Sequence, residues 1–240
     1  MPFRHALVTG ANRGLGLELA RQLLAAGSRV VATCRHPGKA TALNTLAGEH
    51  PGRLHVLPLD VAEPKAHAEL ARELPLVLGG HDDDTPGRLD LLVNNAGVLH
   101  SGERFGSLSA TNLDDSFRTN AAGPLLLTQA LAPRLADGAK VVNLSSSLGS
   151  IASTTRFGTP SYNISKAAQN MATALLARAL SDRGIVVVAF NPGWVRTDMG
   201  GEGAELEPAQ AVAALLRLAE GLGPDDSGHF LDGEGRRLPW

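Results

Sequence analysis

Cysteine and aromatic residues are scarce in this sequence. Its 240 residues include one cysteine, Cys34, so no intrachain disulfide can form and a reducing, cytoplasmic setting is expected. Aromatic residues make up 4% of the chain, and Tyr162 is the one tyrosine. Any chemistry that needs a phenol therefore depends on a single side chain.

Long hydrophobic runs and an excess of one charge are also lacking. No stretch approaches the roughly 18 apolar residues that a membrane span requires. The apolar stretch near the start ends by Val8, which is too short for a secretion signal. Basic and acidic residues nearly balance, at 22 and 24, and no basic stripe carries interleaved aromatics. Neither membrane insertion nor nucleic-acid binding is therefore expected.

Short apolar runs alternate with longer helical patterns along the whole chain. Most of these runs are apolar at nearly every position, which is typical of strands covered on both faces. The alternation predicts an α/β fold of the Rossmann type, with a doubly wound parallel sheet of about seven strands and helices on both faces, in one domain over 1–240. The strands that the pattern locates are Ala6–Thr9, Arg29–Thr33, Arg53–Leu57, Leu89–Val93, Lys140–Leu144 and Ile185–Phe190.

The most polar stretch, Gly79–Gly87, stands between a predicted helix and a predicted strand. Its composition indicates a surface loop. A magnesium or calcium site formed by Asp82, Asp83 and Asp84 is the alternative. We favour the loop and expect no metal.

A glycine-rich turn follows the first predicted strand and enters a helix. It carries Gly10, Gly14 and Gly16 in the spacing Gly-x3-Gly-x-Gly. Glycine lets the backbone approach a ligand closely, and a helix N-terminus offers free N–H groups to an anion. The position indicates a pyrophosphate site, with a purely structural tight turn as the alternative.

The end of the second predicted strand has no carboxylate. An acidic residue there would bind a ribose 2′-hydroxyl and repel a 2′-phosphate. Arg35 stands there instead and can make a forked contact with a phosphate, and Arg13 in the glycine turn is a second cation. NADP(H) is therefore predicted over NAD(H), although both arginines could be solvated surface charges. Asp60, which ends the third strand, could bind the adenine amino group or cap a helix.

Tyr162 and Lys166 are four residues apart in a predicted helix, so they lie on one face of it. A free tyrosine has a pKa of about 10 and is a poor acid or base at neutral pH. A nearby cation favours the phenolate, so this spacing suits general acid–base catalysis. An ordinary surface pair is the alternative. Serines at the end of the fifth strand could hold a substrate carbonyl oxygen, or could form a plain turn.

These motifs occur in a familiar order: the glycine turn, Asn94–Gly97, the serines after the fifth strand and Tyr-x3-Lys. The chain resembles the short-chain dehydrogenase/reductase family over nearly its whole length. It is most similar to the carbonyl-reductase branch that includes C-factor and sniffer-like proteins. The stretches that carry this similarity are Gly14–Leu19, Ser145–Ile151, Asn191–Met199 and Leu238–Trp240.

The resemblance implies a catalytic tetrad. Tyr162 would donate the proton in reduction, and Lys166 would lower the pKa of Tyr162 and hold the nicotinamide ribose. Ser146 would polarise the carbonyl, because the family's serine stands three residues before a glycine, here Gly149; Ser145 and Ser147 are rivals. Asn120 would hold a water in the proton relay to Lys166, or could be an amide in a helix disrupted near Pro124.

The resemblance also implies a cofactor site at the strand ends, in which Thr197 would reach the carboxamide and Asn94 the adenosine ribose. The residues expected to bind NADP(H) are Gly10, Asn12, Arg13, Gly14, Leu15, Gly16, Arg35, Asp60, Val61, Asn94, Ala96, Gly97, Tyr162, Lys166, Pro192, Gly193, Val195 and Thr197.

The implied activity is the NADPH-dependent reduction of an aldehyde, ketone or quinone to an alcohol, or the reverse oxidation. The alternative is a dinucleotide-binding signalling protein of the C-factor type with little turnover. The segment Ser153–Gly158 lengthens the interval between Ser146 and Tyr162 relative to many family members, and we expect it to line the substrate site. Further candidates for that lining are His100, Phe105, Phe157 and Trp194.

Small side chains such as Ala167, Ala168, Ala172 and Ala174 follow Tyr162 in the predicted helix, which runs to about Asp182. They permit close helix packing, and the family commonly pairs subunits there. A homodimer or homotetramer is therefore expected.

Overall fold

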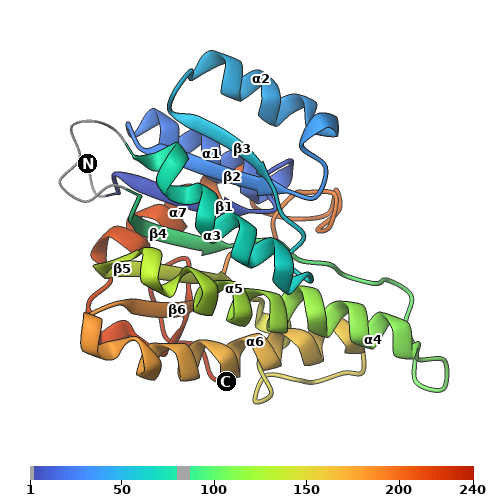
Figure 1. The fold of residues 1–240 in the computed structure, drawn as a ribbon. Helices are drawn as coiled ribbons and strands as arrows, with labels where there is room; N and C mark the ends of the chain where they lie inside the picture. Colours follow the sequence, from blue (N-terminus) through green and yellow to red (C-terminus); the bar gives the residue numbers. More distant parts are fainter. Residues whose placement is uncertain (1–2, 80–86) are drawn as a thin grey trace.

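A seven-stranded parallel sheet forms the centre of the molecule (Figure 1). The computed structural model describes residues 3–79 and 87–240. The strand order is β3-β2-β1-β4-β5-β6-β7, and every neighbouring pair is parallel. The predicted fold class is confirmed. The strands are β1 (His5–Thr9), β2 (Arg29–Cys34), β3 (Leu54–Pro58), β4 (Leu89–Asn94), β5 (Leu135–Leu144), β6 (Val186–Asn191) and β7 (Phe230–Asp232).

Two strands differ from the sequence pattern. β5 begins at Leu135 rather than at Lys140, because the buried Leu135 pairs with Leu89 before the register shifts. The exposed Asp137 and Gly138 interrupt the apolar run there and hid the first part of the strand. β7 has three residues, which is too short for an apolar run to be recognised.

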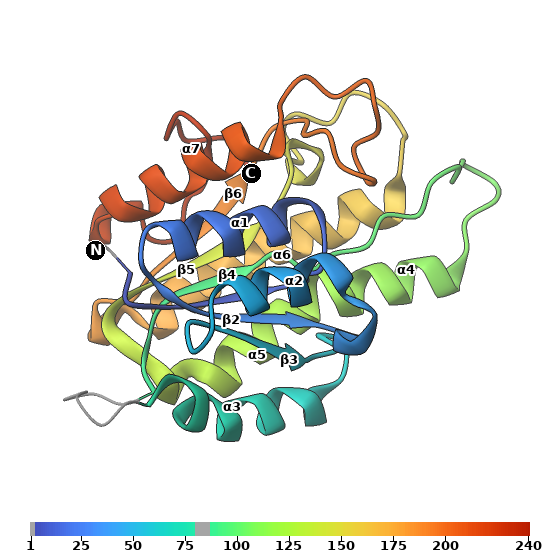
Figure 2. The same cartoon turned by 90° about the horizontal axis from the view of Figure 1, so that it is seen from above.

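Helices cover both faces of the sheet (Figure 2). One face carries α1 (Gly14–Ala25), α2 (Thr41–Glu49) and α7 (Pro208–Gly221), and the other carries α3 (Pro64–Leu78), α5 (Gly123–Leu131) and α6 (Pro160–Ala179). Before α5, α4 (Ala110–Phe117) continues into a π-helical turn, η2 (Arg118–Ala122), and the 3-10 turns η1 (Pro37–Lys39) and η4 (Ser147–Gly149) follow β2 and β5.

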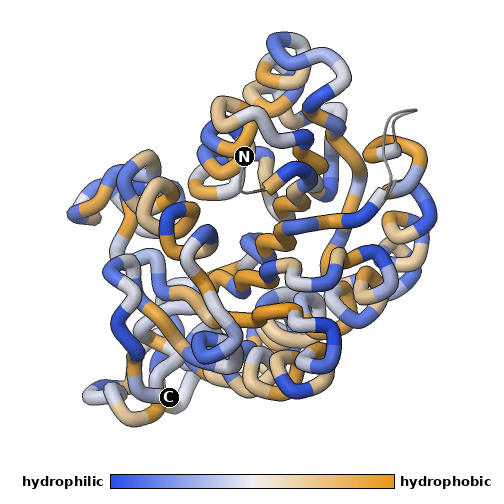
Figure 3. The backbone as a smooth tube through the Cα atoms, turned by 90° about the vertical axis from the view of Figure 1, so that its left-hand side faces the viewer, coloured by the Kyte–Doolittle hydropathy of each residue, from blue (hydrophilic) through white to orange (hydrophobic). Residues whose placement is uncertain are grey.

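Successive side chains of a strand point to opposite faces, so one apolar run fills two cores. Val8 packs with α1 and α7, whereas its neighbour Leu7 packs with α3, α5 and α6. In Figure 3 the hydrophobic stretches gather in the middle of the molecule, and hydrophilic stretches prevail on peripheral turns. With both faces covered, the ends of the strands are left for ligands. The strand order reverses between β1 and β4, and such a reversal opens a crevice at the carboxyl ends of the strands.

The predicted loop Gly79–Gly87, and with it the aspartates of the alternative metal site, falls mostly on residues 80–86, outside the described residues. Within 3–79 and 87–240, no three His, Cys, Asp or Glu side chains come together as a metal site would require. No helix of the same residues has both the length and the apolar character needed to cross a membrane.

Gly16 is the position where the sheet and α1 approach too closely for a side chain. A Cβ at Gly16 would lie 2.4 Å from the Gly10 carbonyl oxygen and 2.5 Å from Asn95 Nδ2. We expect Gly16→Ala to lower the free energy of unfolding by about 1–3 kcal/mol, measured by urea denaturation. Gly48→Ala in α2 is the matched control, because nothing lies within 4 Å of its Cβ. The control should stabilise the protein by up to about 1 kcal/mol, and equal effects of the two substitutions would contradict the prediction.

Candidate active site

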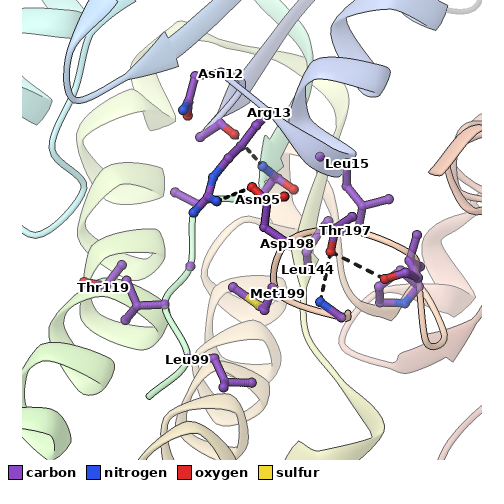
Figure 4. Close-up of a pocket in the computed structure, with 18 of the residues that line it drawn as sticks. Asn12, Arg13, Leu15, Asn95, Leu99, Thr119, Leu144, Thr197, Asp198 and Met199 are labelled. Atoms are coloured by element: carbon purple, nitrogen blue, oxygen red, sulfur yellow. Dashed lines mark hydrogen bonds and ion pairs between the residues drawn. The ribbon is translucent and has the colours of Figure 1, made fainter. Parts of the chain in front are cut away.

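A cleft of about 500 Å³ lies at the carboxyl ends of the strands, where the strand order reverses (Figure 4). Most residues predicted for the cofactor and for catalysis line this one cleft. They are Gly10, Asn12, Arg13, Gly14, Leu15, Arg35, Asp60, Val61, Ala96, Gly97, Ser146, Tyr162, Lys166, Pro192, Gly193, Val195 and Thr197. Three predicted residues, Gly16, Asn94 and Asn120, do not line it.

The glycine turn brings the N-terminus of α1 to the cleft. Gly10 and Gly14 have φ angles of +64° and +54°, a left-handed region that favours glycine. A Cβ at Gly14 would lie 3.4 Å from Thr197 Cγ2, so a side chain there would project across the cleft. No side chain caps α1, and its first N–H groups are therefore free to bind an anion. Gly16 serves this turn by close packing against Gly10 rather than by facing the cleft, which corrects its predicted role.

Basic side chains line the part of the cleft next to β2. They are Arg35 and Lys39, and Lys39 belongs to η1, in the loop that follows the strand. The sequence-based prediction missed Lys39 because it considered only the residues that end the strand; a basic residue in the returning loop was the available signal. Arg13 pairs with Asp198 from the loop after β6 (Figure 4), and both side chains are exposed.

The N-cap of α3 is Glu63, so Asp60 does not have the helix-capping role considered for it. Its Oδ1 accepts a hydrogen bond from the Ala62 main-chain N–H at 3.0 Å, so the carboxylate stabilises the turn that leads into α3. Asp60 also lines the cleft, so the adenine contact considered for it stays a prediction.

The neighbouring residues Asn94 and Asn95 differ in their contacts, and Asn95, for which no cofactor contact was predicted, is the one that lines the cleft. Asn94 is buried, and its Nδ2 donates to Asn143 Oδ1 at 2.7 Å and to Thr128 Oγ1 at 3.2 Å. Asn95 lines the cleft, and its Nδ2 donates to the main-chain oxygens of Thr9 and Gly10. Asn94 therefore holds β4 to its neighbours and does not reach the cleft, because adjacent side chains at a strand end point to opposite sides.

Asn120 is also corrected. Its side chain is fully buried and is occupied by protein partners: Oδ1 accepts from Val98 N at 2.8 Å, and Nδ2 donates to Val98 O and to Ser165 Oγ at 2.9 Å each. The amide therefore fastens η2 to the loop after β4 and to α6. Both N–H donors of the amide are thus used within the protein, and its oxygen has already accepted one hydrogen bond.

Tyr162 and Lys166 come from the first turns of α6. The Glu103 carboxylate, in the loop after β4, accepts the N–H and the hydroxyl of Ser161 at 3.1 and 2.6 Å, which holds the N-terminus of this helix in place. The Lys166 Nζ lies 5.6 Å from the centroid of the Tyr162 ring. It donates to the main-chain oxygen of Leu144 and to Gln169 Oε1.

The serines that end β5 differ in their contacts. Ser146 acts on the Tyr162 phenol, because it lowers the pKa of that group against the effect of burial, and its Oγ accepts from the Leu148 N–H at 3.2 Å. Ser145 donates its hydroxyl to Asn170 Oδ1 at 2.6 Å and is thereby tied to α6. Ser147 does not line the main cleft. The geometry thus singles out Ser146 as the partner of the phenol.

Burial moves both titratable groups of this pair. Desolvation raises the pKa of Tyr162 to about 12, with the hydrogen bond from Ser146 acting in the opposite direction. Desolvation lowers the pKa of Lys166 to about 7. The expectation that Lys166 lowers the pKa of Tyr162 is therefore wrong for the protein by itself. The buried phenolate loses its hydration, and a lysine with a pKa near 7 is only partly charged at neutral pH.

Of the four side chains expected around the substrate, one lines the cleft, Trp194. His100 is hydrogen-bonded to Asp115 at 2.8 Å, away from it. Phe105 and Phe157 form an exposed edge-to-face pair with ring centroids 5.6 Å apart. The segment 153–158 lines a second cavity of about 300 Å³, which shares Leu148 with the main cleft.

Comparison with known proteins gives consistent matches. The model for short chain dehydrogenases matches residues 4–207. The C-signal protein of Myxococcus xanthus is 41% identical over 156 residues, which cover 64% of this chain and 94% of that protein. The NADPH-bound carbonyl reductase from chicken fatty liver and the carbonyl reductase Sniffer of D. melanogaster share 36% and 32% of residues with this chain. Each superposes with a TM-score of 0.91 over 99% of both chains.

The lowered pKa of Lys166 predicts a pH dependence of stability. Its ordinary value is 10.5, so between about pH 7 and pH 10.5 the unfolded chain binds more protons than the folded protein, and the contribution of Lys166 to stability rises with pH. We expect Lys166→Met to be more stable than the wild type at about pH 7, with a difference that shrinks by up to roughly 1 kcal/mol per pH unit towards higher pH. Denaturant titrations at about pH 7, 8 and 9.5 measure this difference, and a constant value would refute the prediction.

Proposed function

The chain belongs to the short-chain dehydrogenase family, and from this premise we propose that it reduces a carbonyl compound to an alcohol with NADPH. The match over residues 4–207 confirms the family resemblance that the sequence motifs indicated. The observation that carries the proposal is the meeting of Tyr162, Ser146 and Lys166 in a cleft whose other part is lined by Arg35 and Lys39. The similar carbonyl reductase from chicken fatty liver is NADPH-bound, which supports the same cofactor here.

The described residues fit a phosphorylated dinucleotide. The glycine turn and the N-terminus of α1, where the N-cap residue Arg13 makes no side-chain capping bond, suit a pyrophosphate. Arg35 and Lys39 suit a 2′-phosphate, since Arg offers a fork of donors and Lys a compact charge. When bound, NADPH supplies the hydride for the carbonyl carbon.

Tyr162 provides the proton in this proposal. A raised pKa keeps the phenol protonated at neutral pH, which is the form that can donate to a carbonyl oxygen. Ser146, which acts on the phenol, can donate its own hydroxyl to the same oxygen. Lys166 Nζ lies 5.6 Å from the centroid of the Tyr162 ring. As the phenol loses its proton, a protonated Lys166 stabilises the negative charge that develops on the phenolate.

The proton that Tyr162 donates must then be replaced. Asn120 lies in the π-helical turn η2, and Pro124, four residues later, has no N–H with which to make an α-helical bond to the Asn120 main-chain carbonyl. In our proposal this carbonyl, rather than the occupied side chain, binds the water that serves Lys166.

A second copy of the chain is the proposed partner. Apolar side chains are exposed on α6, at Ile164, Met171 and Leu175, and on the neighbouring helices at Phe117 and Leu126. Their burial would supply the apolar contact that a dimer or tetramer needs.

The alternative is a dinucleotide-binding signalling role with little turnover, which the similarity to C-signal favours. Tight NADPH binding without NADPH consumption, across a panel of aldehydes, ketones and quinones, would support this alternative over the reductase.

Tyr162→Phe tests the chemistry. The substitution keeps the ring and removes the proton donor, so kcat should fall by at least about 10²–10⁴-fold, while the Kd for NADPH stays within about twofold. Absorbance of the reduced cofactor measures turnover, and fluorescence titration measures binding. Full turnover by this variant would refute the role of Tyr162.

Arg35→Asp tests the cofactor preference. A carboxylate at this position should repel a 2′-phosphate and accept a ribose 2′-hydroxyl, so kcat/KM should come to favour NADH over NADPH. Arg217→Asp on the exposed face of α7 makes the same change in net charge away from the cleft and serves as the control. A wild type that prefers NADH, or an unchanged preference in Arg35→Asp, would contradict the assignment.

A further inference from the structure

Gln169 is a buried amide on α6 that contacts the catalytic lysine. None of its surface is exposed, and Lys166 is 3% exposed. The two residues are three apart on the helix and lie on the same face of it. Burying a polar side chain costs free energy unless its hydrogen bonds are made, so the contacts of this amide indicate what it is for.

The contact joins Lys166 Nζ to Gln169 Oε1 at 3.0 Å. The same Nζ donates to the main-chain oxygen of Leu144, the last residue of β5. A lysine ammonium has three N–H donors, so one remains for the cleft that Lys166 lines. The two described acceptors are the main-chain oxygen of Leu144 and the side-chain oxygen of Gln169, and neither carries a charge.

The amide has one orientation that suits this site. Turned around, its N–H group would face the ammonium, donor against donor. In the orientation observed, Gln169 Nε2 has no hydrogen-bond partner among the described residues. A buried amide that leaves one donor unpaired while its oxygen meets Lys166 is poorly explained by packing, because an apolar side chain would avoid the cost.

The main chain of Gln169 is fixed separately. Thr173 Oγ1 donates to the Gln169 main-chain oxygen at 2.9 Å and accepts from Asn143 Nδ2 at 2.8 Å. This buried chain of contacts links β5 to α6 without using the amide. The amide of Gln169 and the fold around it can therefore be tested apart.

We propose that Gln169 is a positioning residue for the carbonyl reduction proposed above: its amide oxygen holds the Lys166 ammonium beside Tyr162 in the cleft that both residues line. The inference rests on that proposed function. Gln169 does not line the cleft, so it acts through Lys166. Without this acceptor, the ammonium would keep one protein oxygen, and burial would favour the neutral amine more strongly.

Few groups around Lys166 could titrate in its place. From its own helix, Tyr162 faces Nζ, at 5.6 Å from the ring centroid. The elements packed against Lys166 contribute Gly149 of η4 and Gly97 of the loop after β4, whose added Cβ atoms would lie 2.8 Å from Lys166 Cβ and 3.9 Å from Nζ. β5 contributes the Leu144 carbonyl. The protonation of Lys166 is therefore governed by burial, by Tyr162 and by its two oxygen acceptors.

The test measures Lys166 directly. The chain has four lysines, Lys39, Lys65, Lys140 and Lys166, so in protein labelled with ¹³C at the lysine ε-carbon each can be followed by NMR across a pH titration. Lys166→Met identifies the signal. Gln169→Met keeps the length of the side chain and removes the acceptor, and should lower the pKa of Lys166 by about one unit. Gln169→Glu adds a charged acceptor and should raise it.

Turnover should follow the same direction. The pH above which kcat for reduction falls should move down in Gln169→Met and up in Gln169→Glu, with little change in the KM for NADPH. Thr173→Val is the control, because it removes the hydrogen bond to the Gln169 main chain and leaves the amide in place. It should lower stability without moving the pKa of Lys166.

Three outcomes would overturn the inference. The pKa of Lys166 could be unchanged in Gln169→Met, it could shift in the same direction in Gln169→Met and Gln169→Glu, or it could shift equally in Thr173→Val. If Gln169→Met does not fold, the comparison of Gln169→Glu with the wild type decides. The NMR titration needs no turnover, so a wild type that fails to reduce any carbonyl would count against the proposed function and leave the inference on Lys166 testable.

Discussion

The burial of Lys166 is the constraint on which the active-site architecture depends. An ammonium taken out of water becomes a weaker base, and its pKa falls to about 7. It stays in place because the end of β5 and the amide of Gln169 present oxygens to it. Those contacts require α6 to pack closely against η4, where a Cβ at Gly149 would lie 2.8 Å from Lys166 Cβ. The glycine, the helix and the strand end are therefore parts of one arrangement.

The sheet determines where this arrangement faces a ligand. Both faces of the parallel sheet are covered by helices, so binding groups can stand only at the strand ends. The order reverses between β1 and β4, which separates the loops and leaves the cleft. The glycine turn, the cations after β2 and the pair of Tyr162 and Lys166 reach this cleft from different elements.

The sequence-based prediction located correctly those residues whose place at the cleft depends on local spacing. The glycine turn, Arg35 at a strand end and the i,i+4 pair of Tyr162 and Lys166 all line the cleft as expected. It failed where the direction of one side chain decides. Asn94 and Asn95 are adjacent, and the pleat of the strand sends one into the sheet and the other to the cleft. Lys39 was missed because a loop, not a motif, returns it to the cleft.

By itself the sequence determined the fold class, the family and about half of the residues that line the cleft, because apolar periodicity and motif spacing are properties of the chain. Only the tertiary structure decided the chemistry of those residues. Burial moved the pKa of Tyr162 upward, opposite to the expectation, and the contacts of Asn120 occupied the amide that was expected to hold a water. Solvent exposure and hydrogen-bond partners come from residues distant along the chain, so no local pattern encodes them. Lys166 shows both sides: its spacing from Tyr162 was readable from the sequence, but its burial and its contact with the main-chain oxygen of Leu144 were not.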